Sequence, residues 1–425
     1  MREIIIKIAL TVLFLSWING GMIAAKESSG KIQDIGNSGY VLAEDSSNYI
    51  NASILIISSI NEISSVFGHV AFRMECPLHQ LDYVFTFESD SETNGFLTLF
   101  GGKAKAAFIA VPTSQFITDI RNEGRGIRQY ELNLTHHEKQ ELWRFLDNDM
   151  VEGPHRNFNL TNHCVSMAIQ KIQESCIDEQ MEWAPWQGVM LLNNGDLVRR
   201  YVSKSSWAEF WFVTVLGNRY REYADQTVRI SPEQLPHELM RASFVGNDTP
   251  TKRPVITGHE QVLLEELQKP DKDIASPTMF FGVLLAVTCL ITLAEWMWKR
   301  NGRRIAIGYD LALFICQTLA ALVLLYIIIF SEVFGKCWNW YLIPFNLLPL
   351  LIWLCLHKQK NYGRVYLFYT VVLVVFLLMT PFVSQLDIPH QLLTANLVVR
   401  CGSNYMVYNK YSNNNYSTKN ETNEL

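Results

Sequence analysis

The chain has 425 residues, of which 49% are hydrophobic and 18% charged, and its formal net charge at pH 7 is -5. This length allows two domains of ordinary size, and the weak negative charge gives no sign of a nucleic-acid partner. Because the apolar residues are concentrated in the C-terminal third, the chain is not a purely soluble protein.

The N-terminus has the pattern of a secretory signal. Arg2 and Lys7 precede an apolar stretch that ends near Trp17, and small residues follow up to Ala25. This pattern is typical of a segment that is removed after export. We therefore expect residues 1–25 to be a signal peptide, with an uncleaved N-terminal anchor as the alternative. In both cases the chain that follows is exported.

Residues 26–247 are expected to form an extracytoplasmic α+β domain. Short β-branched or aromatic runs separated by turn residues predict an antiparallel sheet with strands at 52–58, 68–74, 81–87, 106–111 and 130–134. Helical spacing and capping signals predict helices at 112–123, 135–146 and 162–174. The Trp-rich and Phe-rich segment 183–223 is expected to be core, with the lipid surface as the alternative.

The C-terminal third predicts a membrane region over residues 279–384, preceded by a juxtamembrane linker at 248–278 in which 261–267 could form a short helix. Four apolar runs are each close to the roughly 20 residues that span about 30 Å of hydrocarbon. They are residues 279–297, 310–334, 340–356 and 365–383.

Basic residues in the loops predict the orientation of these spans. Those between the first two spans and between the last two are Lys299, Arg300, Arg303, Arg304, Lys358, Lys360 and Arg364. Basic loops stay in the cytoplasm, which puts the soluble domain outside. Residues 385–425 are then an extracytoplasmic tail, and the part after Cys401 has no apolar period and is expected to lack regular structure.

Eight cysteines divide between the two environments. Cys289, Cys316 and Cys355 lie within the expected spans. The five that face the oxidising side are Cys76, Cys164, Cys176, Cys337 and Cys401. Five cannot all pair. Pairing of Cys76 with Cys176, or of Cys337 with Cys401, stays open. Because no CxxC or histidine-rich spacing occurs, we expect no metal and no cofactor.

Cys164 and His69 carry the strongest chemical signal. Cys164 follows Asn162-His163 in the first turn of a predicted helix, where free backbone N–H groups lower a thiol pKa and can serve as an oxyanion hole. His69 follows Gly68 at the start of an apolar strand, a rigid support for the base of a cysteine nucleophile. The pair predicts an acyl-transfer site. The alternatives are a disulfide-bonded or buried Cys164 and a structural His69.

A third polar residue usually orients the histidine of such a site. The candidates are Glu88, Asp90 and His79, with His163 and Asn162 as flanking residues. Lys103 follows a Gly-Gly pair and Arg73 alternates with apolar residues, so both are weaker candidates for binding an anionic lipid head group. A solvated Lys103 and an Arg73 paired with a carboxylate are the structural alternatives.

Several short stretches together resemble one protein family. They are Phe67-Gly68-His69-Val70-Ala71-Phe72-Arg73, Tyr83-Val84-Phe85-Thr86-Phe87, Phe100-Gly101-Gly102-Lys103, Leu132-Asn133-Leu134-Thr135 and Asn162-His163-Cys164. Over about residues 51–172 the chain resembles the extracytoplasmic domain of the Lnb family of bacterial lipoprotein intramolecular N-acyltransferases. The membrane spans resemble those of relatives more loosely.

The resemblance implies a fold and a reaction. The order of His69 before Cys164 resembles a permuted papain-like domain, of the NlpC-type/lecithin:retinol acyltransferase-like class, followed here by a four-helix transmembrane region. Cys164 would take an acyl chain from the diacylglyceryl group of a lipoprotein as a thioester and pass it to the amine of the lipoprotein's N-terminal cysteine. The implied partners are diacylglyceryl-modified lipoproteins and membrane lipid, and the implied location is the bacterial inner membrane with the catalytic domain in the periplasm.

Two departures from the family pattern bear on the site. His163 stands where relatives have asparagine, with Asn162 displaced by one position, and Thr86, Phe87 and Glu88 stand where a glycine and an aspartate are expected. Two other functions stay open on the sequence alone. One is a cysteine hydrolase of lipid esters or cell-wall amides, and the other is a non-catalytic membrane scaffold.

Overall fold

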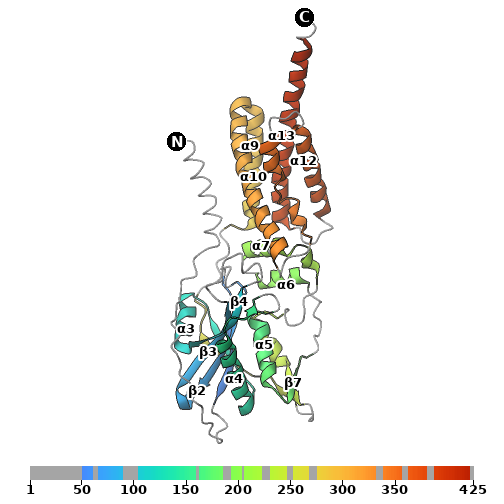
Figure 1. Ribbon diagram of the computed structural model, residues 1–425. Helices are drawn as coiled ribbons and strands as arrows, with labels where there is room; N and C mark the ends of the chain where they lie inside the picture. The colour runs from blue at the N-terminus through green and yellow to red at the C-terminus, as the bar shows by residue number, and fades with distance from the viewer. Residues whose placement is uncertain are drawn as a thin grey trace.

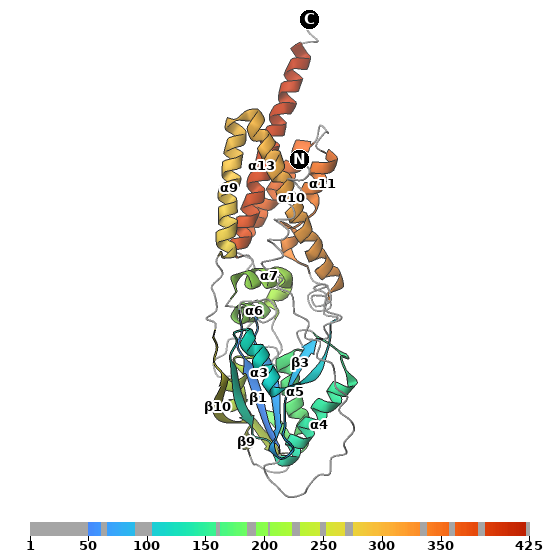
Figure 2. The same ribbon diagram turned by 90° about the vertical axis from the view of Figure 1, so that its left-hand side faces the viewer.

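The computed structural model combines a sheet domain with a bundle of helices, and two short helices lie between them (Figures 1 and 2). It describes residues 50–60, 66–89, 104–158, 162–184, 193–202, 205–222, 230–246, 252–267, 275–331, 338–356, 362–380 and 387–421. The predicted signal peptide lies outside the described residues.

A seven-stranded sheet in which every pairing is antiparallel forms the centre of the first domain, in the order β10-β5-β1-β2-β3-β4-β6. Its strands are β1 (Asn51–Ile57), β2 (His69–Cys76), β3 (Leu81–Ser89), β4 (Lys105–Pro112), β5 (Ile127–Leu132), β6 (Arg156–Asn157) and β10 (Ile256–Leu264). The strands predicted from β-branched and aromatic runs are confirmed. All three predicted helices of this domain are present as well: α3 (Thr113–Asn122), α4 (His136–Glu152) and α5 (Cys164–Ser175).

The central strands are buried on both faces, which is why their sequences are almost continuously apolar. Val70 and Phe72 of β2 belong to the core shared with α4 and α5, whereas Ala71 belongs to the core shared with α3. Successive side chains of a strand point to opposite faces. β2 therefore contacts α4 and α5 on one side of the sheet and α3 on the other, and its first residues lie between these two layers of helices.

The linker predicted at 248–278 is wrong for residues 252–264. They form β9 (Lys252–Pro254), in a small sheet with β7 (Glu179–Glu182) and β8 (Ser243–Gly246), and then β10 at the edge of the main sheet. The short helix expected at 261–267 is replaced by β10 as far as Leu264. Most side chains of β10 are exposed, so the strand carries no hydrophobic alternation and is recognised only through its pairing with β5.

The aromatic segment connects the two domains. Its described parts form α6 (Asn194–Tyr201), α7 (Ser206–Leu216) and the 3-10 helix η3 (Gly217–Arg221), between sheet domain and bundle (Figure 1). The ring of Phe210 packs on Phe281 with centroids 5.3 Å apart, and Trp207 packs on Phe280 at 5.6 Å. This aromatic cluster is buried between the two domains. The expectation that the segment is core therefore holds for its described part, and the alternative of a lipid-exposed surface does not.

The bundle contains α9 (Pro277–Met297), α10 (Lys299–Phe330), η5 (Trp340–Leu342), α11 (Leu348–Leu351), the π-helix η6 (Ile352–Leu356), α12 (Tyr362–Met379) and α13 (Ile388–Glu421). Within the described residues, α9 and the stretch Asn301–Phe330 of α10 are long and apolar enough to cross a membrane. Residues Gly363–Met379 form a shorter apolar helix.

The tail predicted at 385–425 is wrong for residues 388–421, which form α13. This helix packs against α9 and α12 and ends at the side of the bundle away from the sheet domain (Figure 1). The prediction failed because α13 carries Asn396, Arg400, Ser403 and Asn404, which remove the apolar signature of a span.

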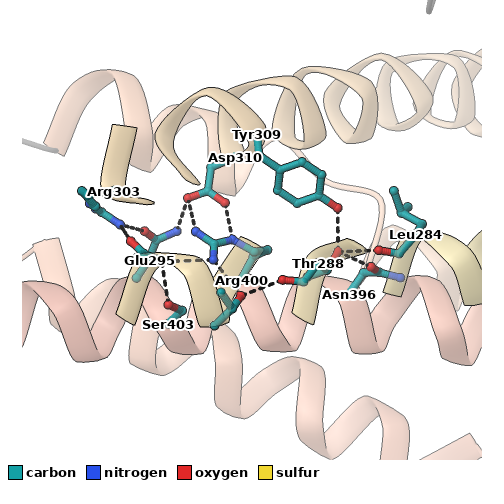
Figure 3. Close-up of polar contacts among 11 residues, drawn as sticks. Leu284, Thr288, Glu295, Arg303, Tyr309, Asp310, Asn396, Arg400 and Ser403 are labelled. Atoms are coloured by element: carbon teal, nitrogen blue, oxygen red, sulfur yellow. Dashed lines mark hydrogen bonds and ion pairs between the residues drawn. The ribbon is translucent and has the colours of Figure 1, made fainter. Parts of the chain in front are cut away.

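These polar residues are paired inside the bundle (Figure 3). The fully buried guanidinium of Arg400 binds both carboxylate oxygens of Asp310 at 2.6 and 2.9 Å and Oε2 of Glu295 at 3.1 Å. Arg303 binds the other oxygen of Glu295. Two arginines thus meet two carboxylates from α9 and α10, and the paired charges make a polar helix compatible with the bundle.

Candidate functional site

The start of β2 is held in a conformation that requires glycine. Gly68 has φ +74°, and a Cβ there would lie 3.0 Å from the carbonyl oxygen of Ile57. His69 follows and pairs with Ile57 in the ladder. The left-handed backbone and the close approach to β1 both exclude a side chain. The Gly-His pair of the sequence therefore fixes where the imidazole leaves the sheet.

The imidazole is bound on one side by the next strand. His69 Nε2 lies 2.6 Å from Oγ1 of Thr86, a residue of β3 with no exposed surface. The Thr86 hydroxyl in turn donates to Oε1 of Glu88 at 3.2 Å. Glu88, one of the predicted third members, thus reaches His69 through Thr86, and Thr86 was not among the predicted residues.

Cys164 is the first residue of α5, as predicted. The backbone N–H of His163 donates to Oγ of Ser166 at 3.0 Å, which caps the start of the helix. Asn162 donates its side-chain amide to the carbonyl of Asn157 at 3.2 Å and ties the preceding chain to β6. Both flanking residues therefore hold the helix N-terminus that presents the thiol.

The structure brings Cys164 to the start of β2. The backbone N–H groups of Val70, the residue after His69, and of Val165 and Cys164 lie close enough to the thiol to lower its pKa. Between the described side chains of Cys164 and His69 no direct hydrogen bond is formed. In the described part of the chain, Cys164 is thus connected to His69 only through the peptide N–H of Val70, the next residue along β2.

Burial sets the resting protonation of the pair. It raises the pKa of the Cys164 thiol to about 11, although the N–H of Val70, the helix N–H groups and the charge of Arg125 act in the opposite direction. It also lowers the pKa of His69 to about 3, with a smaller contribution from Arg125. The predicted lowering of the thiol pKa is therefore wrong for the resting site, because desolvation outweighs the helix N-terminus. At rest the thiol and the imidazole are therefore both neutral.

Arg125 is a second residue that the sequence did not single out. It stands between α3 and β5, is 5% exposed, and donates from Nε to the carbonyl of Ser58 at 2.7 Å and from Nη1 to Glu123 at 3.0 Å. Ser58 directly follows the end of β1, so the guanidinium is anchored beside the strand that pairs with His69. The only sequence signal was a charged residue between two glycines.

The other predicted residues lie elsewhere. Arg73 forms a bidentate pair with Asp82, at 2.8 and 2.7 Å, which is the carboxylate pairing of its structural alternative. His79 is exposed in η1 (Pro77–His79), beyond the far end of β2. Lys103 and Asp90 lie outside the described residues. Burial lowers the pKa of His163 to about 4, and its ring has no hydrogen bond to the described His69 or Cys164.

The cysteines of the described chain bear on the scaffold alternative. Cys164 is free and partly buried, and Cys76, Cys176 and Cys401 are free and buried. A disulfide between Cys76 and Cys176 is therefore absent, and Cys401 lies inside α13, where its side chain has no exposed surface. Cys337 lies outside the described residues. Cys164 is the free thiol of the described sheet domain that combines a helix N-terminus with a nearby histidine.

The site faces the bundle. The ring of Phe67, two residues before His69, packs on Tyr201 of α6 and on Phe212 of α7, with centroids 6.3 and 5.1 Å apart. The opposite side of α7 contacts Phe281 of α9. The start of β2 is therefore at the end of the sheet domain next to the membrane helices, as Figure 2 also shows for α6 and α7.

Comparisons with known families agree with this two-part architecture. Residues 40–192 match the model described as the Lnb N-terminal periplasmic domain, and residues 269–412 match the model of the Lnb transmembrane domain. The second match includes the helix α13 as far as residue 412. Searches of curated proteins and of solved structures gave no match.

Proposed function

This chain belongs to the Lnb family of lipoprotein N-acyltransferases, and on that premise we propose that it transfers an acyl chain through a thioester on Cys164, with His69 as acid and base. The family places a periplasmic domain beside a transmembrane domain in one membrane protein related to lipoprotein N-acylation. The finer mechanism rests on the site. A permuted papain-like domain is the fold that this proposal implies, since a helix N-terminus presents the cysteine to a strand that carries the histidine.

One observation carries the proposal: the Cys164 thiol lies beside the backbone N–H of Val70, the residue that follows His69. A nucleophile and its base need this closeness, and the strand and helix N-terminus hold both without a flexible loop. The backbone N–H groups of Val70 and Val165, which lower the thiol pKa, are donors of the kind that stabilise an oxyanion.

The first half-reaction forms the thioester. As Cys164 Sγ attacks the ester carbonyl of the diacylglyceryl group, its proton moves to the free ring nitrogen of His69. The carbon–oxygen bond then breaks, and His69 returns the proton to the glycerol oxygen. Because the resting thiol and imidazole are both neutral, proton transfer accompanies the attack and does not precede it.

The second half-reaction uses the lipoprotein amine. Its nitrogen attacks the thioester carbonyl, the carbon–sulfur bond breaks, and the amine proton passes through His69 to the departing sulfur. The products are an N-acylated lipoprotein with one acyl chain fewer on its glycerol and the free thiol. Donor ester and acceptor amine both lie at the outer lipid surface, so holding the site there raises their effective concentration.

Desolvation favours transfer over hydrolysis. A hydrolase requires water at the acyl-enzyme, and the burial that shifts the pKa values of both Cys164 and His69 limits water there. The contact of Phe67 with α7 orients the same end of the domain toward lipid. A hydrolase of lipid esters remains the second candidate, because it would use the same two residues.

Mass spectrometry of lipoprotein N-terminal peptides tests the proposal. Cells that lack this protein are complemented with wild type, Cys164→Ser, His69→Ala, or the control Cys289→Ser, whose cysteine is exposed on α9. Transfer predicts N-acylated peptides with wild type and the control alone. Peptides that lose an ester chain without gaining an N-acyl chain would assign a hydrolase. Unchanged N-acylation with Cys164→Ser would contradict the role of Cys164 as the nucleophile.

A further inference from the structure

We propose that Thr86 is a positioning residue whose hydroxyl, oriented by Glu88, fixes the tautomer of His69 so that Nδ1 is the ring nitrogen left with a free lone pair for proton transfer. The inference rests on the proposed function for its catalytic meaning. The contacts that carry it, between His69, Thr86 and Glu88, are independent of any substrate.

The first step concerns why a hydroxyl is present at this position. Thr86 lies in the middle of the sheet, pairs with Ala71 of β2 and Ile109 of β4, and has no exposed surface. Valine has the same shape and a high preference for strands. Burying a hydroxyl costs free energy unless it is hydrogen-bonded. At this position the only hydrogen bonds of the hydroxyl, among described residues, are those to His69 and Glu88.

The second step concerns the direction of the hydrogen bonds. A threonine hydroxyl has a single proton, and a carboxylate can only accept. Thr86 donates that proton to Glu88 and must accept from His69, so Nε2 carries the imidazole proton. In a neutral imidazole the other nitrogen, Nδ1, is then a free acceptor. A base that removes a thiol proton requires this free lone pair.

The third step concerns Glu88. Desolvation and the neighbouring carboxylates Glu123 and Asp119 raise the pKa of Glu88, whereas the hydrogen bond from Thr86 lowers it. Glu88 accepts from the Thr86 hydroxyl and, among the described residues, has no hydrogen bond to His69 itself. Glu88 orients the Thr86 hydroxyl by accepting its hydrogen bond, in the way that the acid of a catalytic triad orients the histidine. Without Glu88, the Thr86 hydroxyl can turn and donate to Nε2, which favours the wrong tautomer.

The experiment uses the full-length protein in membranes and two readouts. The first is the rate at which iodoacetamide alkylates Cys164, followed by peptide mass spectrometry from pH 5 to 10. The second is lipoprotein N-acylation. A neutral His69 that assists the thiol gives a rate independent of pH around neutrality, and free thiolate adds a separate rise at high pH. The His69→Ala variant defines the profile without assistance.

The variants separate the hydroxyl from the shape of the side chain. Thr86→Val is expected to lose the rate around neutral pH by on the order of 10²-fold while the rise at high pH persists. Thr86→Ser should retain most of the rate, and Glu88→Ala should fall between these two. N-acylation should follow the same order. Because valine fits the strand, the melting temperature of Thr86→Val should not fall.

Two outcomes would overturn the inference. One is a Thr86→Val profile like that of wild type. The other is a Thr86→Ser loss as large as that of Thr86→Val, which would assign the effect to packing. If Thr86→Val does not fold, the comparison of Thr86→Ser with the exposed Glu88→Ala decides in the same way. Alkylation that depends on Thr86, together with N-acylation that does not depend on Cys164, would retain the positioning role and refute the proposed function.

Discussion

Phe67 and Phe212, which come from the sheet domain and from the helix next to the membrane bundle, meet edge to face with ring centroids 5.1 Å apart. Phe67 is separated from His69 by a single glycine, and α7 continues the contact to Phe281 through Phe210. The distance between the candidate base and the lipid surface is therefore set by aromatic packing.

Phe212→Ala is expected to weaken lipoprotein N-acylation more than it weakens the fold. An aromatic pair of this geometry contributes about 0.5–1.5 kcal/mol beyond its buried area, and its loss frees the segment before His69. The measurement is N-acylation in membranes together with iodoacetamide labelling of Cys164, which should become faster as the site opens. Phe368→Ala, an exposed aromatic residue on α12, is the control. Equal effects of both variants would contradict a specific role.

Gly68→Ala is expected to abolish most activity. Alanine at φ +74° costs about 1–2 kcal/mol, and here its Cβ also approaches the Ile57 carbonyl to 3.0 Å, so the strand start and His69 must shift. Gly258→Ala is the matched control, because Gly258 has φ +82° with no atom within 4 Å of the added Cβ. In a thermal melt Gly258→Ala should show the cost of the positive φ alone, and Gly68→Ala should lose more because of the added contact, while only Gly68→Ala should lose activity. If both retain activity, the placement of His69 does not depend on Gly68.

The pH dependence of Cys164 alkylation should show no step near pH 6.5. The pKa of His69 is lowered to about 3, so His69 keeps its neutral, proton-accepting form as the pH falls through 6.5 and loses it only near pH 3. The thiol pKa of about 11 adds a rise toward high pH. A rate that drops tenfold between pH 7.5 and 5.5 would show that His69 titrates normally and that the pair is solvated at rest.

Asp310→Asn is expected to destabilise the bundle, because it leaves Arg400 buried with only a shared carboxylate. Removing one partner of a buried ion pair costs about 3–5 kcal/mol. The thermal melt of the full-length protein in detergent measures the loss, and Asp310→Asn combined with Arg400→Gln should recover part of it. Arg304→Gln removes an exposed charge nearby and should leave the melt unchanged. A melt of Asp310→Asn equal to that of wild type would contradict the role of the network.

The sequence predicted well those parts of the fold in which one local signal decides the structure. β2 and β3 are apolar on both faces, and α4 begins with the capping box of Thr135 and Glu138, whose two hydrogen bonds form as expected. The strand β10 and the helix α13 have no such local signal. The exposed residues of β10 follow from its position at the sheet edge, and the polar residues of α13 are explained by charges on α9 and α10.

The candidate site divides in the same way. His69 and Cys164 could be predicted because glycine before a strand and a cap before a helix are local features. Thr86 could not, since a threonine in a strand is ordinary, and its role depends on a histidine 17 positions away. The raised thiol pKa also required the structure, because the extent of desolvation depends on how the site is covered.

The ion-pair network has a consequence for how the protein is made. Glu295 is followed after eight residues by its partner Arg303, whereas Asp310 leaves the ribosome ninety residues before Arg400, so a nascent chain holds an uncompensated carboxylate at Asp310 until α13 is made. A charged residue at the centre of a lone membrane helix costs about 2.5–3.5 kcal/mol on insertion scales. Synthesis that stops before Arg400 thus yields a product that membrane proteases and chaperones can distinguish from the finished molecule, and half-lives of truncated chains would measure that distinction.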